Sequence, residues 1–157
     1  MATLKGVQLT LLMGPIAVAP VPVAVIDALE SAQVTQAVGQ RSGFQISFTY
    51  SKTSPIARTL LPAGFFDPMI RVILVATLNG MPKVLADGPI KRQDVVASSS
   101  PGENRLTITG EDVSGYMDVI DFTGFPFPGM PTVARVAALI AKYAMFGIIP
   151  LPIPEIF

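Results

Sequence analysis

Proline and glycine interrupt this chain so often that little room is left for long helices. The sequence has 15 prolines and 13 glycines among its 157 residues. Proline breaks a helix interior, and glycine weakens any regular element because it loses the most backbone freedom. One segment, residues 132–146, combines good helix formers with a possible cap at Thr132 and a terminating Gly147. The sequence therefore predicts a mainly β fold with one or two helices toward the C-terminus.

Between these interruptions, apolar and polar residues alternate in short runs. The clearest run is residues 44–50, where the odd and even positions differ in polarity throughout. A period of two is typical of a strand with one buried face. Phe44, Ile46, Phe48 and Tyr50 would share the buried face, opposite Gln45, Ser47 and Thr49. We also expect strands at 7–13, 30–36, 70–78, 83–86, 90–97 and 105–109, and the nearly all-apolar residues 70–78 to be buried on both faces.

The expected strands are joined by recognisable turns. Asn79-Gly80 is a strong hairpin signal, and Asp87-Gly88-Pro89 predicts a second turn. Residues 51–68 are expected to form a loop, and residues 25–30 are ambiguous. Hairpins at this spacing are typical of a sandwich or barrel. We therefore expect residues 1–113 to form a tube-like antiparallel β-barrel or sandwich module. Residues 114–157 would be a helical extension, the start of a second module or a link.

Charge is scarce in this chain. Charged residues make up 14% of it, against about 25% in ordinary soluble domains. The 11 basic and 11 acidic side chains cancel, and half of the residues are apolar. This composition argues against disorder and against nucleic-acid binding through bulk positive charge. It favours a protein whose surface is largely covered by other subunits.

No segment has the pattern of a membrane-spanning helix, which needs about 20 consecutive apolar residues. Prolines 15, 20 and 22 interrupt the uncharged stretch 11–26, and the stretch 133–149 carries Arg135 and Lys142. We therefore expect no membrane span.

The residues that most often carry catalysis are missing. The chain has no histidine and no cysteine, which removes the commonest general base, thiol nucleophiles and the usual zinc ligands. The main acidic cluster is Glu111-Asp112, followed by Asp118 and Asp121. Adjacent strand residues point to opposite faces, so Glu111 and Asp112 cannot flank one bond as glycosidase carboxylates do. We interpret them as marking a strand end and a helix start, where acids are favourable.

Three other groups of residues suggest binding chemistry but have a simpler structural interpretation. Lys91 and Arg92 could contact phosphate, although such a pair usually lies on the solvated side of a strand. The aromatic residues of 44–50 could stack on bases, although a core face is favoured. Lys52 and Arg58 are too scattered to form a basic patch. The sequence thus predicts no catalytic residue, no cofactor-binding residue and no metal ligand, and favours a protein that is not an enzyme.

The order of several short motifs resembles a known family. The motifs are Val7-Gln-Leu-Thr-Leu-Leu-Met-Gly-Pro15, Ser31-Ala-Gln-Val-Thr35, Ser42-Gly-Phe-Gln-Ile-Ser-Phe48, Leu61-Pro-Ala-Gly64, Arg71-Val-Ile-Leu-Val75, Asn79-Gly80, Leu85-Ala-Asp-Gly88, Pro101-Gly102, Leu106-Thr-Ile-Thr-Gly-Glu-Asp-Val113 and Met117-Asp118. In this order and spacing they resemble the N-terminal part of the baseplate hub proteins of contractile-tailed phages and related injection particles. This is the phage late control D-like family, and the resemblance covers nearly all of residues 5–150.

The resemblance implies a structural role without enzymatic residues or cofactors. Such hubs form a ring that joins the inner tail tube to the central spike. The implied partners are copies of the chain itself (a trimer or a six-fold-like ring), the tail tube protein, the central spike protein and baseplate wedge proteins. The implied location is the tail baseplate of a virion or an assembled injection particle, made in the bacterial cytoplasm. The alternative is a tail tube or tube-adaptor protein; a membrane-surface protein and a hydrolase domain are less favoured.

Overall fold

The computed structural model describes residues 2–4, 7–15, 17–98, 104–118 and 129–148. The chain divides into two compact units, residues 1–115 and residues 116–157. This division falls two residues after the boundary expected from the sequence. The fold is mainly β, with 46% of the described residues in strands. We call residues 1–115 the β module.

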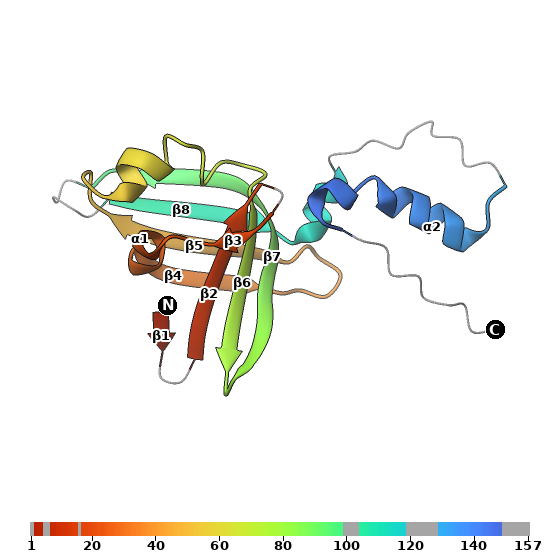
Figure 1. The fold of residues 1–157 in the computed structure, drawn as a ribbon, viewed down its shortest axis with the longest axis horizontal. Helices are drawn as coiled ribbons and strands as arrows, with labels where there is room; N and C mark the ends of the chain where they lie inside the picture. Colours follow the sequence, from red (N-terminus) through yellow and green to blue (C-terminus); the bar gives the residue numbers. More distant parts are fainter. Residues whose placement is uncertain (1, 5–6, 16, 99–103, 119–128, 149–157) are drawn as a thin grey trace. The chain divides into compact units, whose positions relative to one another are not determined.

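One antiparallel sheet forms the β module (Figure 1). Its strand order is β1-β2-β6-β7-β8-β5-β4, and β3 pairs with β2 beside this path. Among the described residues β1 and β4 do not pair with each other, so the sheet is open and not a closed barrel. The strands are β1 (Ala2–Leu4), β2 (Val7–Gly14), β3 (Ala19–Pro20), β4 (Leu29–Thr35), β5 (Gly43–Tyr50), β6 (Arg71–Leu78), β7 (Met81–Val96) and β8 (Asn104–Glu111).

Strand β7 corrects one expectation from the sequence. The expected turn at Asp87-Gly88-Pro89 does not exist, because all 16 residues of β7 form one strand. The Asp87 carboxylate accepts two hydrogen bonds of 2.7 Å from the Arg71 guanidinium, and Gly88 and Pro89 continue the ladder with β6. This cross-strand pairing overrides the local turn preference of the three residues.

The continuous β7 makes the corner of the module. Residues 81–89 pair with β6, and residues 90–96 pair with β8. Figure 1 shows the consequence: β2 and β6 run crosswise to β4, β5 and β8, and β7 bends from one direction to the other. One bulged residue lies on each side of the bend, Leu85 against β6 and Lys91 against β8. Strands that change sheets through bends and bulges are typical of orthogonal packing.

The core lies between the two crossing parts of the sheet. The face of β5 formed by Phe44, Ile46, Phe48 and Tyr50 is buried, as the alternation predicts. Ser47 on the other face is also buried, with its hydroxyl 3.3 Å from that of Thr107. Strand β6 was expected to be buried on both faces, but only Val72 and Leu74 are buried fully. The other buried core residues include Leu11, Met13, Val21, Val25, Ile56, Phe66, Ile90, Leu106 and Ile108.

Short helices and turns complete the β module. Helix α1 (Val23–Asp27) covers the first half of the ambiguous segment 25–30, and β4 begins within the second half. The expected loop 51–68 contains a π-helical turn, η1 (Ile56–Leu60), so that expectation was incomplete. The Asn79-Gly80 hairpin turn is confirmed, with both residues at positive φ (51° and 80°). A 3₁₀ helix, η2 (Val113–Asp118), follows β8 where a short helix was expected.

Within residues 116–157, the expected helix 132–146 is divided into α2 (Thr132–Ala141) and the 3₁₀ turn η3 (Ala144–Phe146). Pro131 occupies the N-cap position without a side-chain hydrogen bond, so Thr132 is not the cap. Gly147 has a left-handed φ of 75° after η3, as a terminating glycine should. Val133 and Val136 of α2 are both exposed. None of the helices in the described ranges is long and apolar enough to cross a membrane.

Candidate functional site

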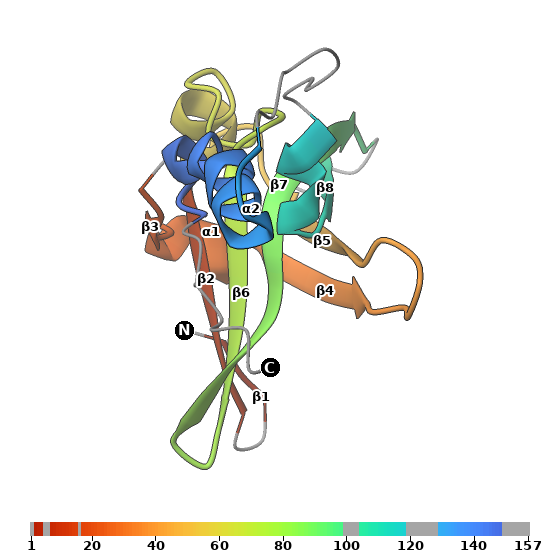
Figure 2. The same cartoon turned by 90° about the vertical axis from the view of Figure 1, so that its right-hand side faces the viewer.

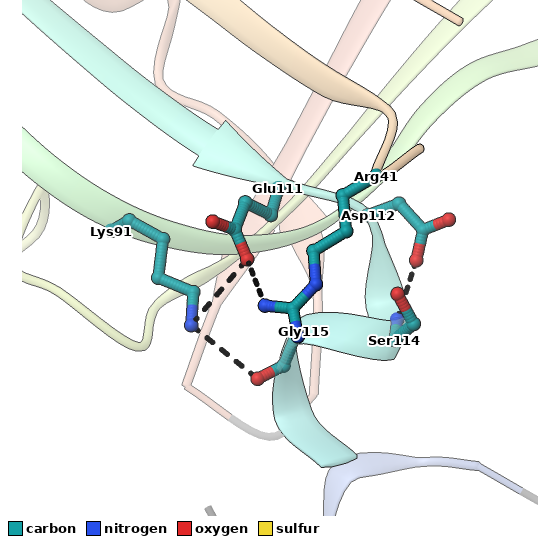
Figure 3. A network of polar contacts seen from close by, with 6 residues as sticks. All are labelled: Arg41, Lys91, Glu111, Asp112, Ser114 and Gly115. Carbon is teal, nitrogen blue, oxygen red and sulfur yellow. Dashed lines mark hydrogen bonds and ion pairs between the residues drawn. The ribbon is translucent and has the colours of Figure 1, made fainter. Parts of the chain in front are cut away.

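A cluster of charged side chains marks the corner where β8 ends (Figure 3). The Oε2 atom of Glu111 lies 3.3 Å from Nη1 of Arg41 and 3.7 Å from Nζ of Lys91. The same Nζ donates a 3.4 Å hydrogen bond to the carbonyl oxygen of Gly115. Because Lys91 is the bulged residue of β7, the bulge directs its side chain to the end of β8. The cluster therefore fixes the position at which the chain leaves the sheet.

Asp112 has a separate role beside this cluster. Its carboxylate accepts a hydrogen bond from the backbone N–H of Ser114, in the first turn of η2. Figure 3 shows the Asp112 side chain pointing away from the carboxylate of Glu111. The structure thus confirms the interpretation of Glu111 and Asp112 as a strand end and a helix start. The acidic pair is not arranged around a common substrate position.

The remaining residues singled out in the sequence are distributed as follows. Asp118 ends η2, and Asp121 lies outside the described residues. Arg92 is exposed and pairs with Asp94 at 2.8 Å, whereas Lys91 is part of the corner cluster and not simply solvated. Lys52 and Arg58 are exposed on separate turns. The aromatic rings of β5 are buried, which leaves no stacking platform on that face. The described ranges contain no group of three or more potential metal-ligating side chains.

A pocket that sequence reasoning missed lies beside the corner. We call it the corner pocket, and its volume is about 240 Å³. The side chain of Gln36, just after β4, spans this region and donates a 3.1 Å hydrogen bond to the carbonyl oxygen of the bulged Leu85. The pocket is lined by Val34, Gln36, Ser42, Gly43, Phe44, Val84, Leu85, Ala86, Asp87, Asp112 and Val113. Residues 84–87 of β7 form one wall of it, although the sequence predicts a turn beginning at Asp87.

The end of the β6–β7 hairpin is a second surface feature. We call residues 78–83 the hairpin tip. Figure 2 shows that it projects beyond β4 and β5. Its apolar residues are solvent-exposed: Leu78 by 55% and Met81 by 75%. Lys83 is also exposed and is the tip's one charged residue. Exposed large apolar side chains at a projecting end often mark an interaction site.

A group of polar side chains links the strands at the free edge of the sheet, where β4 lies. Glu30 is the bulged residue of β4, and its carboxylate accepts a 2.9 Å hydrogen bond from the Thr49 hydroxyl of β5. The Arg105 guanidinium of β8 donates two more, of 3.0 and 2.6 Å. The Thr49 hydrogen bond, together with the nearby positive charge of Arg105, lowers the pKa of Glu30 below its ordinary value. The three side chains link three neighbouring strands at this edge.

We predict a pH dependence of stability from this group. A carboxylate whose pKa is lower in the folded state stabilises the fold above its unfolded pKa, and this contribution is lost as pH falls through the folded pKa. Glu30→Gln should therefore be less stable than the parent at neutral pH, with a difference that shrinks in acid. Urea unfolding between pH 7 and pH 3 measures it. In an Arg105→Met background the pH-dependent difference should be smaller, and an unchanged difference there would contradict the role of Arg105.

No protein-family model matches the sequence, and no curated protein is significantly similar to it.

Proposed function

We propose that this protein is a structural component of the baseplate hub of a contractile phage tail or related injection particle. It would form a ring that joins the inner tail tube to the central spike. The proposal extends the resemblance stated from the sequence motifs. Its structural support is one observation: the sheet is open, and it ends in a long strand whose outer edge has no partner in the described structure.

The edge strand β4 has little protection against pairing with other chains. Edge strands of monomeric proteins are commonly very short, rich in charge, broken by proline, twisted by a bulge or covered by another element. The bulge of β4 lies at Glu30, near its start, and residues 31–35 are regular. Strand β4 has seven residues and contains no proline. Its one charge, Glu30, is engaged by Thr49 and Arg105 of the same sheet. Within the described residues β4 pairs with β5 alone. An edge of this kind suits a module that neighbouring subunits complete.

The tube-like barrel expected from the sequence becomes, in this proposal, a property of the assembly. One chain contributes an open, bent sheet, and neighbouring copies would continue it around a trimer or six-fold-like ring. The further partners would be the tail tube protein, the central spike protein and baseplate wedge proteins. The protein would be made in the bacterial cytoplasm and reside in the tail baseplate or the assembled particle.

The proposal predicts self-association through β4. The parent chain should associate at tens of micromolar in a sedimentation-velocity experiment. Two variants of β4 are compared, Ala32→Pro and Gln33→Pro, each of which removes one backbone N–H group. Adjacent N–H groups point to opposite sides of a strand, so one of the two variants loses a hydrogen bond to β5 and the other alters only the free edge. Circular dichroism identifies the variant that keeps the fold. That variant should associate far more weakly than the parent, because its proline interrupts the free edge.

A proline in the following loop serves as the matched control. Val38→Pro changes a fully exposed residue in a turn before Gly39, where proline is compatible with the backbone. It should assemble as the parent does. A monomeric parent, or normal assembly of the folded β4 variant, would contradict the proposal. Electron microscopy then separates a hub from the alternative: single closed rings indicate a hub, and long stacks of rings indicate a tail tube protein.

A further inference from the structure

We propose that the hairpin tip of one copy inserts into the corner pocket of another copy, with Met81 filling the pocket and Lys83 beside Asp112. This inference rests on the proposed function, because it specifies a contact by which the copies join. It is carried by the match between the two surfaces in size, polarity and charge.

The corner pocket suits a single apolar side chain. Its volume of about 240 Å³ is below the range of about 300–1,000 Å³ for typical small-molecule sites. Much of its wall is apolar, from Val34, Phe44, Leu85 and Val113. A flexible, unbranched side chain such as methionine adapts well to a cavity of this irregular kind.

The charge of the pocket indicates what should accompany that apolar side chain. Its two charged lining residues, Asp87 and Asp112, are both acidic. Asp87 is neutralised by Arg71 at 2.7 Å, whereas Asp112 has no ion pair among the described residues. The pocket therefore favours an apolar side chain with a cation close by.

The hairpin tip presents this combination. Met81 and Lys83 are two residues apart on one strand, so both side chains point to the same face, about 7 Å apart along the strand. Lys83 makes no ion pair within the part of the chain that the structure describes. The tight Asn79-Gly80 turn and the ladder with β6 hold the two residues in a rigid arrangement. Little conformational freedom would be lost on docking.

The tip cannot enter the pocket of its own chain. Both include residues of β7: the tip ends at Lys83, and the next residue, Val84, is the first of β7 to line the pocket. A continuous strand cannot fold back on itself over one residue, so a tip that fills this pocket must come from another copy. The two surfaces are different, and a contact of this head-to-tail kind produces a ring or a stack, depending on the rotation between copies.

Two complementary variants test the contact. Met81→Asp disables the tip and leaves the pocket intact. Ser42→Trp fills the pocket from its partly exposed rim and leaves the tip intact. Each variant alone should associate at least tenfold more weakly than the parent. Their equimolar mixture should associate more strongly than either variant alone, because it has one intact tip and one intact pocket to join.

Cysteine crosslinking tests the same contact without disabling it, and the chain has no cysteine of its own. Mild oxidation of Met81→Cys mixed with Ser42→Cys should yield the mixed disulfide as the main product. Val38→Cys mixed with Ser42→Cys is the matched control, because Val38 is fully exposed but outside the tip. Equal crosslinking of the two mixtures would overturn the inference.

The outcomes separate this inference from the proposed function. If the parent assembles and both variants assemble equally well, the tip–pocket contact is wrong and the proposed function stands. If the parent stays monomeric and the Met81→Cys and Ser42→Cys mixture does not crosslink, both are wrong. Loss of assembly in either variant counts only when its thermal unfolding matches that of the parent; otherwise the crosslinking result decides.

Discussion

Phe48→Ala should lower the free energy of unfolding by about 3–5 kcal/mol, the usual range for removing a buried phenylalanine ring. Phe48 is fully buried on the inner face of β5. Its ring packs against that of Phe66, with 5.5 Å between the ring centroids. Truncation leaves a cavity between the crossing parts of the sheet, and continuous strands on both sides restrict its collapse. Urea denaturation of the two proteins measures the difference.

A control on the same strand separates burial from strand propensity. Gln45→Ala changes the exposed face of β5 and should alter stability by no more than about 0.5 kcal/mol. If Phe48→Ala cost equally little, the core assignment of this face would be wrong.

The strands that the sequence predicted well are mostly those whose burial is one-sided. Residues 44–50 correspond to β5, 30–36 to β4, 7–13 to β2 and 105–109 to most of β8. In β2, β5 and β8 the alternation of side chains records which face is turned to the core. Strand β4 was located correctly although it is largely exposed, with Leu29 and Val34 partly buried. The Asn79-Gly80 turn was equally predictable, because few residue pairs accept its positive φ angles.

The continuous strand β7 was not predictable from local pattern. Asp87-Gly88-Pro89 has the composition of a turn, yet here Arg71 binds Asp87 and the ladder with β6 holds the segment extended. Those partners are distant in sequence or become neighbours only once the hairpin has formed. The turn η1 was missed for a related reason: its five residues are too few to show helical periodicity.

In the candidate site, the sequence predicted correctly only those roles that depend on a residue's immediate neighbours in the chain. Glu111 and Asp112 were correctly interpreted because a strand end and a helix start are local features. The corner pocket combines residues following β4 with parts of β5, β7 and η2. It also depends on the bulge at Leu85, which no sequence pattern indicates. The ion pair of Lys91 depends in the same way on the second bulge of β7.

Strand β7 changes its pairing partner from β6 to β8 between Pro89 and Ile90. We expect the stability of the fold to be especially sensitive to substitutions near this point. Gly88 lies in the bend, pairs with Val72 of β6 and passes close to the end of β8. A methyl group on Gly88 would overlap the carbonyl oxygen of Glu111 and lie 2.6 Å from the carbonyl carbon of Asp112. Both atoms belong to the backbone, so no side-chain rotation relieves the contact.

Gly88→Ala should therefore destabilise the β module by at least the upper end of the range of about 1–3 kcal/mol seen for overpacking. The strand cannot bend as closely past β8, and the ion pairs of Glu111 with Arg41 and Lys91 should weaken with it. Chemical denaturation measures the loss. Gly129→Ala is the matched control, since a methyl group there meets nothing within 4 Å. Equal unfolding midpoints for the two variants would mean that β7 and β8 separate at little cost, and that the close approach at Gly88 does not hold the corner.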